Sequence, residues 1–85
     1  MRTFQEMRMN VDYMMEQMRR NAIDHVFEKF KEADRHYYET CEGGDEVTRL
    51  IKELEELGAN MEYVIEVDLQ IRDEVAMEVS KNENI

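Results

Sequence analysis

The carboxylates in the second half of the chain are the residues whose type and spacing can do chemistry. Between positions 53 and 78 there are nine acidic residues and only one basic residue, Arg72. A dense group of carboxylates attracts basic partners and speeds their association. These nine residues are the candidate partner-binding surface: Glu53, Glu55, Glu56, Glu62, Glu66, Asp68, Asp73, Glu74 and Glu78.

The charge of the chain is unevenly distributed. The net charge is −10, yet residues 1–38 carry equal numbers of acidic and basic residues, so residues 39–85 hold the whole excess. Direct binding of DNA or RNA needs a basic surface and is not expected here. A row of carboxylates can instead stand in for a row of phosphates. The charge therefore favours a basic nucleic-acid-binding protein as the partner.

In size, charge and expected dimerisation, the chain resembles the small acidic nucleic-acid mimics that bacteriophages make to disable host proteins. This resemblance implies an inhibitor that blocks the DNA- or RNA-binding surface of its partner. It rests on no family motif and assigns no functional residue. The alternative is a small antitoxin or regulatory adaptor that binds a partner through a helical face of Met and aromatic residues. A third hypothesis is a purely structural oligomer.

Catalysis, metal binding and cofactor binding are not expected. The sequence has no phosphate loop, Gly-rich cofactor turn, catalytic triad pattern or metal-ligand spacing. His25 and His36 would lie about 16 Å apart along a helix, too far to share a metal. Cys41 is the only cysteine, which excludes an internal disulfide and favours a cytoplasmic location. No apolar run is long enough to span a membrane.

Apolar residues recur every three or four positions through the first part of the chain, and no Gly or Pro occurs before Gly43. The mean spacing of about 3.67 residues is helical and predicts one long amphipathic helix over 4–40. Apolar and polar residues alternate over 7–13, so a short strand there is an open alternative. The predicted core or dimer seam consists of Phe4, Met7, Val11, Met15, Met18, Ala22, Val26 and Phe30.

The second half of the chain changes its pattern twice. The pair Gly43-Gly44 is expected to end the first helix, and 3–4 spacing predicts a second helix over 45–57, with Gly58 as its terminator. Residues 61–71 then alternate between apolar and polar, which predicts a β-strand with Glu62, Glu66 and Asp68 on its solvent face. Residues 80–85 are predicted to form a frayed tail.

The predicted fold class is an α-rich α+β single domain, 1–85, completed by homodimerisation. A helix of 37 residues is about 55 Å long, whereas a compact chain of this length has a radius of gyration near 12 Å. A lone strand also needs a partner edge. An all-α dimer is the alternative. A second alternative is a compact monomer in which the first helix breaks near Asn10 or Asn21.

Overall fold

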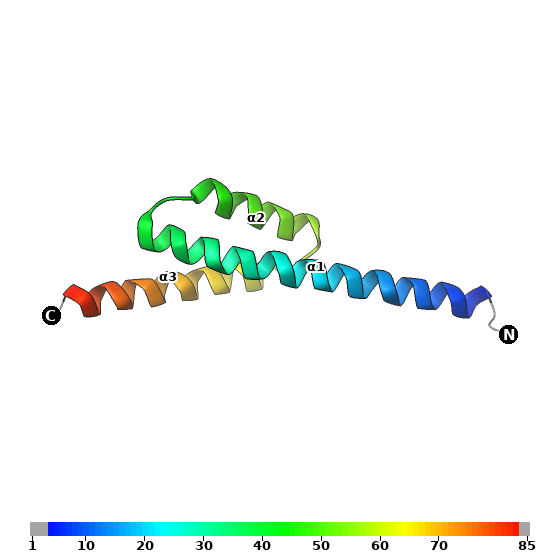
Figure 1. Ribbon diagram of the computed structural model, residues 1–85. Coiled ribbons are helices and arrows are strands. Elements are labelled where there is room, and N and C mark those ends of the chain that lie inside the picture. The colour runs from blue at the N-terminus through cyan, green and yellow to red at the C-terminus, as the bar shows by residue number, and fades with distance from the viewer. Residues whose placement is uncertain (1–3, 84–85) are drawn as a thin grey trace.

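The computed structural model describes the backbone of residues 4–83 and the side chains of residues 10–81. Over that range the chain forms three α-helices (Figure 1). Helix α1 spans Phe4–Thr40, α2 spans Gly44–Glu56 and α3 spans Met61–Glu83. Helix α2 returns along the C-terminal part of α1, and α3 reverses direction again on another side of α1 (Figure 1). The chain is therefore an up-down-up arrangement built around α1.

The molecule is elongated. Its principal extents are 71 × 22 × 17 Å and its radius of gyration is 18.4 Å, well above the roughly 12 Å of a compact chain of this length. The N-terminal part of α1 and the C-terminal part of α3 extend in opposite directions beyond α2 (Figure 1). Residues 4–22 of α1 are hereafter called the arm. The part in which α1, α2 and α3 pack together is called the body.

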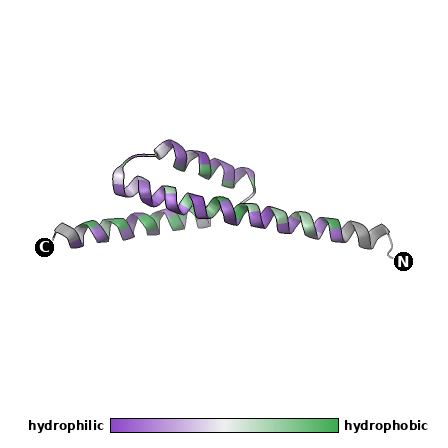
Figure 2. Ribbon diagram, viewed as in Figure 1, coloured by the Kyte–Doolittle hydropathy of each residue, from purple (hydrophilic) through white to green (hydrophobic). Residues whose placement is uncertain are grey.

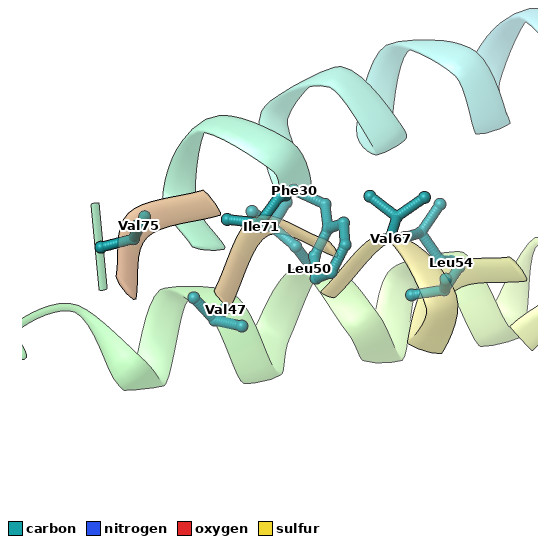
Figure 3. Packing of buried hydrophobic residues seen from close by; sticks show 8 residues of the cluster. Phe30, Val47, Leu50, Leu54, Val67, Ile71 and Val75 are labelled. Carbon is teal, nitrogen blue, oxygen red and sulfur yellow. The ribbon is translucent and has the colours of Figure 1, made fainter. Parts of the chain in front are cut away.

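The core of the body lies where the three helices meet. Phe30 of α1 is fully buried, as is Leu54 of α2, while Leu50 of α2 is almost so. Figure 3 shows these side chains packed together with Ile71 of α3. The spacing of three or four residues between buried positions on each helix directs one face of each toward this point. The complete buried cluster is Phe30, Val47, Leu50, Leu54, Val64, Val67, Ile71 and Val75.

The turn between α2 and α3 is fixed by backbone and side-chain caps. The N–H of Ala59 donates to the carbonyl of Leu54, and the N–H of Gly58 donates to the carbonyl of Glu55. This is the Schellman pattern, and Gly58 adopts the positive φ of 83° that it requires. The Oδ1 atom of Asn60 then accepts hydrogen bonds from the first N–H groups of α3. The chain therefore ends one helix and begins the next within four residues.

The turn between α1 and α2 begins earlier than the Gly pair. Helix α1 ends at Thr40, and Cys41 takes the left-handed conformation with φ of 60°. Its N–H donates to the carbonyl of Tyr37, and the Thr40 hydroxyl accepts a hydrogen bond from the N–H of Glu42. A side chain with a Cβ atom is strained in this conformation. Gly43, with φ of 85°, then forms the N-cap of α2.

Replacing Cys41 with glycine is expected to raise the free energy of unfolding by about 0.5–1 kcal/mol, because glycine adopts positive φ without a Cβ clash. Cys41→Ala is the matched control, since it removes the thiol and keeps the Cβ atom. Urea denaturation of both variants gives the comparison. Equal stabilities for the two variants would show that Cys41 carries no backbone strain.

The predicted β-strand over 61–71 is wrong, because this segment is the first half of α3. The alternating apolar residues divide between two sides of the helix: Val67 and Ile71 enter the core, whereas Ile65 and Leu69 are exposed. The α+β fold class is therefore replaced by an all-α one, consistent with the all-α alternative. The expected tail also differs, since α3 continues to Glu83.

The first helix has no break in the described residues. Helix α1 is continuous through Asn10 and Asn21, so neither the compact fold-back nor the short strand near 7–13 is present. None of the helices in the described part of the chain has an apolar stretch that could cross a membrane.

Candidate functional site

The arm of α1 presents an apolar face that no other described part of the chain covers. Val11, Met14, Met15 and Met18 are each between 54% and 68% exposed, and these four residues are called the arm face. Their spacing places them on one side of the helix over two turns. Figure 2 shows apolar residues continuing along α1 well outside the body. An exposed, contiguous group of large apolar side chains marks a surface for binding another molecule.

Three charged residues near the C-terminal end of the arm, Glu16, Arg19 and Arg20, form ion pairs with one another. The carboxylate of Glu16 accepts a hydrogen bond from Arg19 at 2.7 Å and another from Arg20 at 3.3 Å. The hydrogen bond from Arg19 lowers the pKa of Glu16. Spacings of one and two residues from the arm face put Glu16 and Arg20 on the other side of the helix. The arm face is therefore electrically neutral.

The predicted seam along α1 is divided between exposed and buried parts. Val11, Met15 and Met18 are exposed on the arm, whereas Phe30 is buried in the body. Two more members, Ala22 and Val26, are partly buried. The last two, Phe4 and Met7, have side chains outside the described residues. Of the six members whose side chains are described, three are exposed and three are buried or partly buried.

Four of the nine candidate acidic residues form ion pairs. Arg35 of α1 pairs with both Glu74 and Glu78 of α3. On α2, Arg49 pairs with Glu53 at 3.0 Å. A longer contact of 3.6 Å joins Arg72 to Asp73. Basic residues from both halves of the chain therefore offset part of the predicted acidic surface.

The other acidic residues do not form one ridge. Glu55 and Glu56 lie at the end of α2, and Glu62 and Glu66 lie on the first turns of α3; within the described part of the chain these four make no ion pair. Glu62 and Glu66 are four residues apart and share a helix face. Asp68, expected beside them on a strand, instead turns toward α1. The helical period separates side chains that an alternating strand would have aligned.

Asp68 belongs to a cluster that the sequence did not reveal. The hydroxyl of Tyr38 donates a hydrogen bond of 2.9 Å to Oδ1 of Asp68. Beside them, Asp34 is only 1% exposed, and its Oδ2 atom has no hydrogen-bond partner. Burial raises the pKa of Asp34 to about 7, with a further contribution from the neighbouring Asp68 carboxyl. Burial also raises the pKa of Tyr38 to about 12.

The only sequence signal for this cluster is the position of Asp34. It follows Phe30 by four residues and precedes Tyr38 by four, so all three lie on one helix face. A buried carboxyl next to another carboxyl holds a proton near neutral pH, which makes the Asp34–Asp68 pair sensitive to pH. No group of three metal-ligating side chains occurs among the residues with described positions.

Comparisons with protein-family models, with curated proteins and with solved structures find no match to this chain.

Proposed function

We propose that this chain is a small regulatory or adaptor protein that works by protein–protein association through the arm face. The observation that carries the proposal is the exposure of Val11, Met14, Met15 and Met18 on a helix that projects from a packed body. Methionine side chains are flexible and polarizable, so they adapt to an apolar partner surface. The binding mode that fits is helix against helix or helix in a groove.

The negative charge has a secondary role in this proposal. A nucleic-acid mimic needs its carboxylates in one continuous array, and here ion pairs with Arg35 and Arg49 interrupt the array. The carboxylates without an ion pair are divided between α2 and α3, and Asp68 faces α1. The hypothesis of an acidic inhibitor of a basic nucleic-acid-binding protein therefore has less support from the geometry than association through the arm face.

A matched pair of double variants separates the two functions. Met14→Gln with Met18→Gln is expected to reduce capture of the partner by about tenfold or more, since two apolar contacts of roughly 1 kcal/mol or more each are lost. Glu62→Gln with Glu66→Gln is expected to leave capture nearly unchanged. The measurement is recovery of partner proteins on immobilised full-length chain at low and high salt.

The opposite result would support the acidic inhibitor instead. In that case the glutamine variants on α3 would lose the partner, and raising the salt concentration would elute it, because exposed charge pairs are screened. Both double variants lie at exposed positions outside the buried core, so urea denaturation followed by circular dichroism is expected to show that the body still unfolds cooperatively in each.

A further inference from the structure

We propose that the occupant of the arm face is the arm of a second copy of this chain, paired antiparallel about a two-fold axis at Val11. This inference rests on the proposed function, because it names the partner of the same surface. Three features of the arm carry it: the spacing of its apolar residues, the distribution of its charge and its isolation from the body.

The spacing of the apolar residues is self-complementary. Val11, Met14 and Met18 follow the steps of three and four that define a coiled-coil seam. An antiparallel pair centred on Val11 places Met18 opposite sequence position 4 and Met15 opposite position 7. These positions are phenylalanine and methionine, and Val11 faces its own copy, so apolar residue types oppose one another at these positions, whereas Met14 lies opposite position 8, an arginine. A two-fold interface requires this kind of self-matching surface.

The distribution of charge favours the arm over the other helices as a contact between identical chains. Residues 10–21 of the arm carry two acidic and two basic residues, Asp12, Glu16, Arg19 and Arg20, so they sum to zero. Helix α3 carries seven acidic and two basic residues, and α2 carries five and two. Contact through α2 or α3 would bring like charges together in a chain with a net charge of −10.

Among the described residues, the arm face also lacks a partner within the chain. It is a helix of 19 residues, and isolated helices of about this length are marginally stable in water even with favourable sequences. The four residues of the arm face are exposed, and Glu16 and Arg20 lie on the opposite side of the helix. Burying these residues against an identical arm stabilises both helices at once. The two bodies would then lie at opposite ends of the paired arms.

The first test is the oligomeric state of the full chain by sedimentation equilibrium. The wild-type chain is expected to be a dimer at about 100 µM and to dissociate on dilution. Val11→Glu is expected to weaken the dimer by about 100-fold or more, because the axis places two like charges opposite each other. Tyr13→Glu is the matched control: Tyr13 is 67% exposed but lies on the other side of the arm, so this variant is expected to remain dimeric.

The second test reports the orientation of the two arms. In a chain carrying Cys41→Ala, which removes the natural thiol, Val11→Cys is expected to form an intermolecular disulfide on mild oxidation. Met18→Cys is expected not to, because an antiparallel pair holds the two copies of position 18 about 21 Å apart along the axis. Disulfides at both positions would show a parallel pair and overturn the proposed register.

The outcomes also separate this inference from the proposed function. A wild-type chain that is monomeric at about 100 µM overturns the second-copy proposal. If such a monomer still captures a different protein, and Met14→Gln with Met18→Gln abolishes that capture, association through the arm face stands with another occupant. If neither self-association nor capture responds to changes in the arm face, both proposals fail.

Discussion

Replacing Phe30 with alanine is expected to lower the free energy of unfolding by about 3–5 kcal/mol. Phe30 is fully buried at the point where α1 meets α2 and α3 (Figure 3). The change removes an aromatic ring that packs near Leu50 and Ile71 and leaves a cavity. Because small domains unfold with a total of only about 5–15 kcal/mol, this variant is expected to lose much of its stability.

The measurement is urea denaturation followed by circular dichroism, repeated at several protein concentrations so that subunit association is separated from folding. Leu69→Ala is the control, because Leu69 is an exposed apolar residue on α3. Its expected effect is about 0.5 kcal/mol or less. A loss below about 1 kcal/mol for Phe30→Ala would contradict the central position of this side chain in the core.

The first two helices, α1 and α2, could be predicted from the sequence because the apolar spacing and the position of the glycines agree. Helix α1 covers the range expected for the long N-terminal helix, and α2 lies within one residue of the predicted range at each end. Steps of three and four between apolar residues, together with the glycines near both turns, predict helices over both ranges, although alternating residue types left a short strand near 7–13 open. Helix α1 ends at Thr40, the last residue of the expected range, but the residue that terminates it is Cys41 rather than the Gly43-Gly44 pair, and a non-glycine residue rarely takes this conformation.

Helix α3 was predicted as a strand because two of its faces carry apolar residues. The core face contains Val64, Val67 and Ile71, and a second face contains Ile65 and Leu69. Because residues of the two faces interleave along the sequence, apolar residues occur at every second position, which is the pattern of a strand. The decisive local signal is Asn60, two residues after Gly58, since an asparagine shortly after a helix terminator is a typical N-cap.

The candidate acidic surface shows which part of a site the sequence alone leaves open. The sequence identifies every carboxylate but does not show which of them meets a base. Arg35 reaches Glu74 across 39 positions because α1 and α3 pack side by side. The burial of Asp34 could likewise not be predicted from the sequence, because acidic residues are usually exposed. Asp34 is enclosed by the packing of α3 against α1 together with Val47 and Thr48 of α2.

The buried Asp34 gives the chain a distinctive dependence on pH. In the folded chain the pKa of Asp34 is raised to about 7, above its ordinary value of 3.8, by burial and by Asp68. Between these two values the folded state holds a proton that the unfolded state releases. The free energy of unfolding is therefore expected to fall as the pH rises from about 4 to about 7, and this contribution levels off above that range.

The groups around Asp34 do not oppose this trend. Asp68 and Tyr38 face it from α3 and α1, and the hollow beside it is lined on α2 by the uncharged Val47 and Thr48. Arg72 lies close enough to act on the pKa of Tyr38. Salt-bridged carboxylates elsewhere act in a different range: the pKa of Glu46 is lowered by Arg49, so its contribution is lost only as the pH falls below about 4.5.

Asp34→Asn is expected to remove the decline in stability between pH 4 and pH 7 and to make the chain more stable at pH 8 by on the order of 1–3 kcal/mol, because the amide is neutral and can donate to Asp68. Asp73→Asn is the matched control, since Asp73 is an exposed carboxylate on α3, and it is expected to keep the wild-type slope. The measurement is urea denaturation of the three proteins at closely spaced pH values. If Asp34→Asn and the wild type decline in parallel, the proton that titrates near pH 7 is not held by the buried pair, and the packing of α3 against α1 does not depend on it.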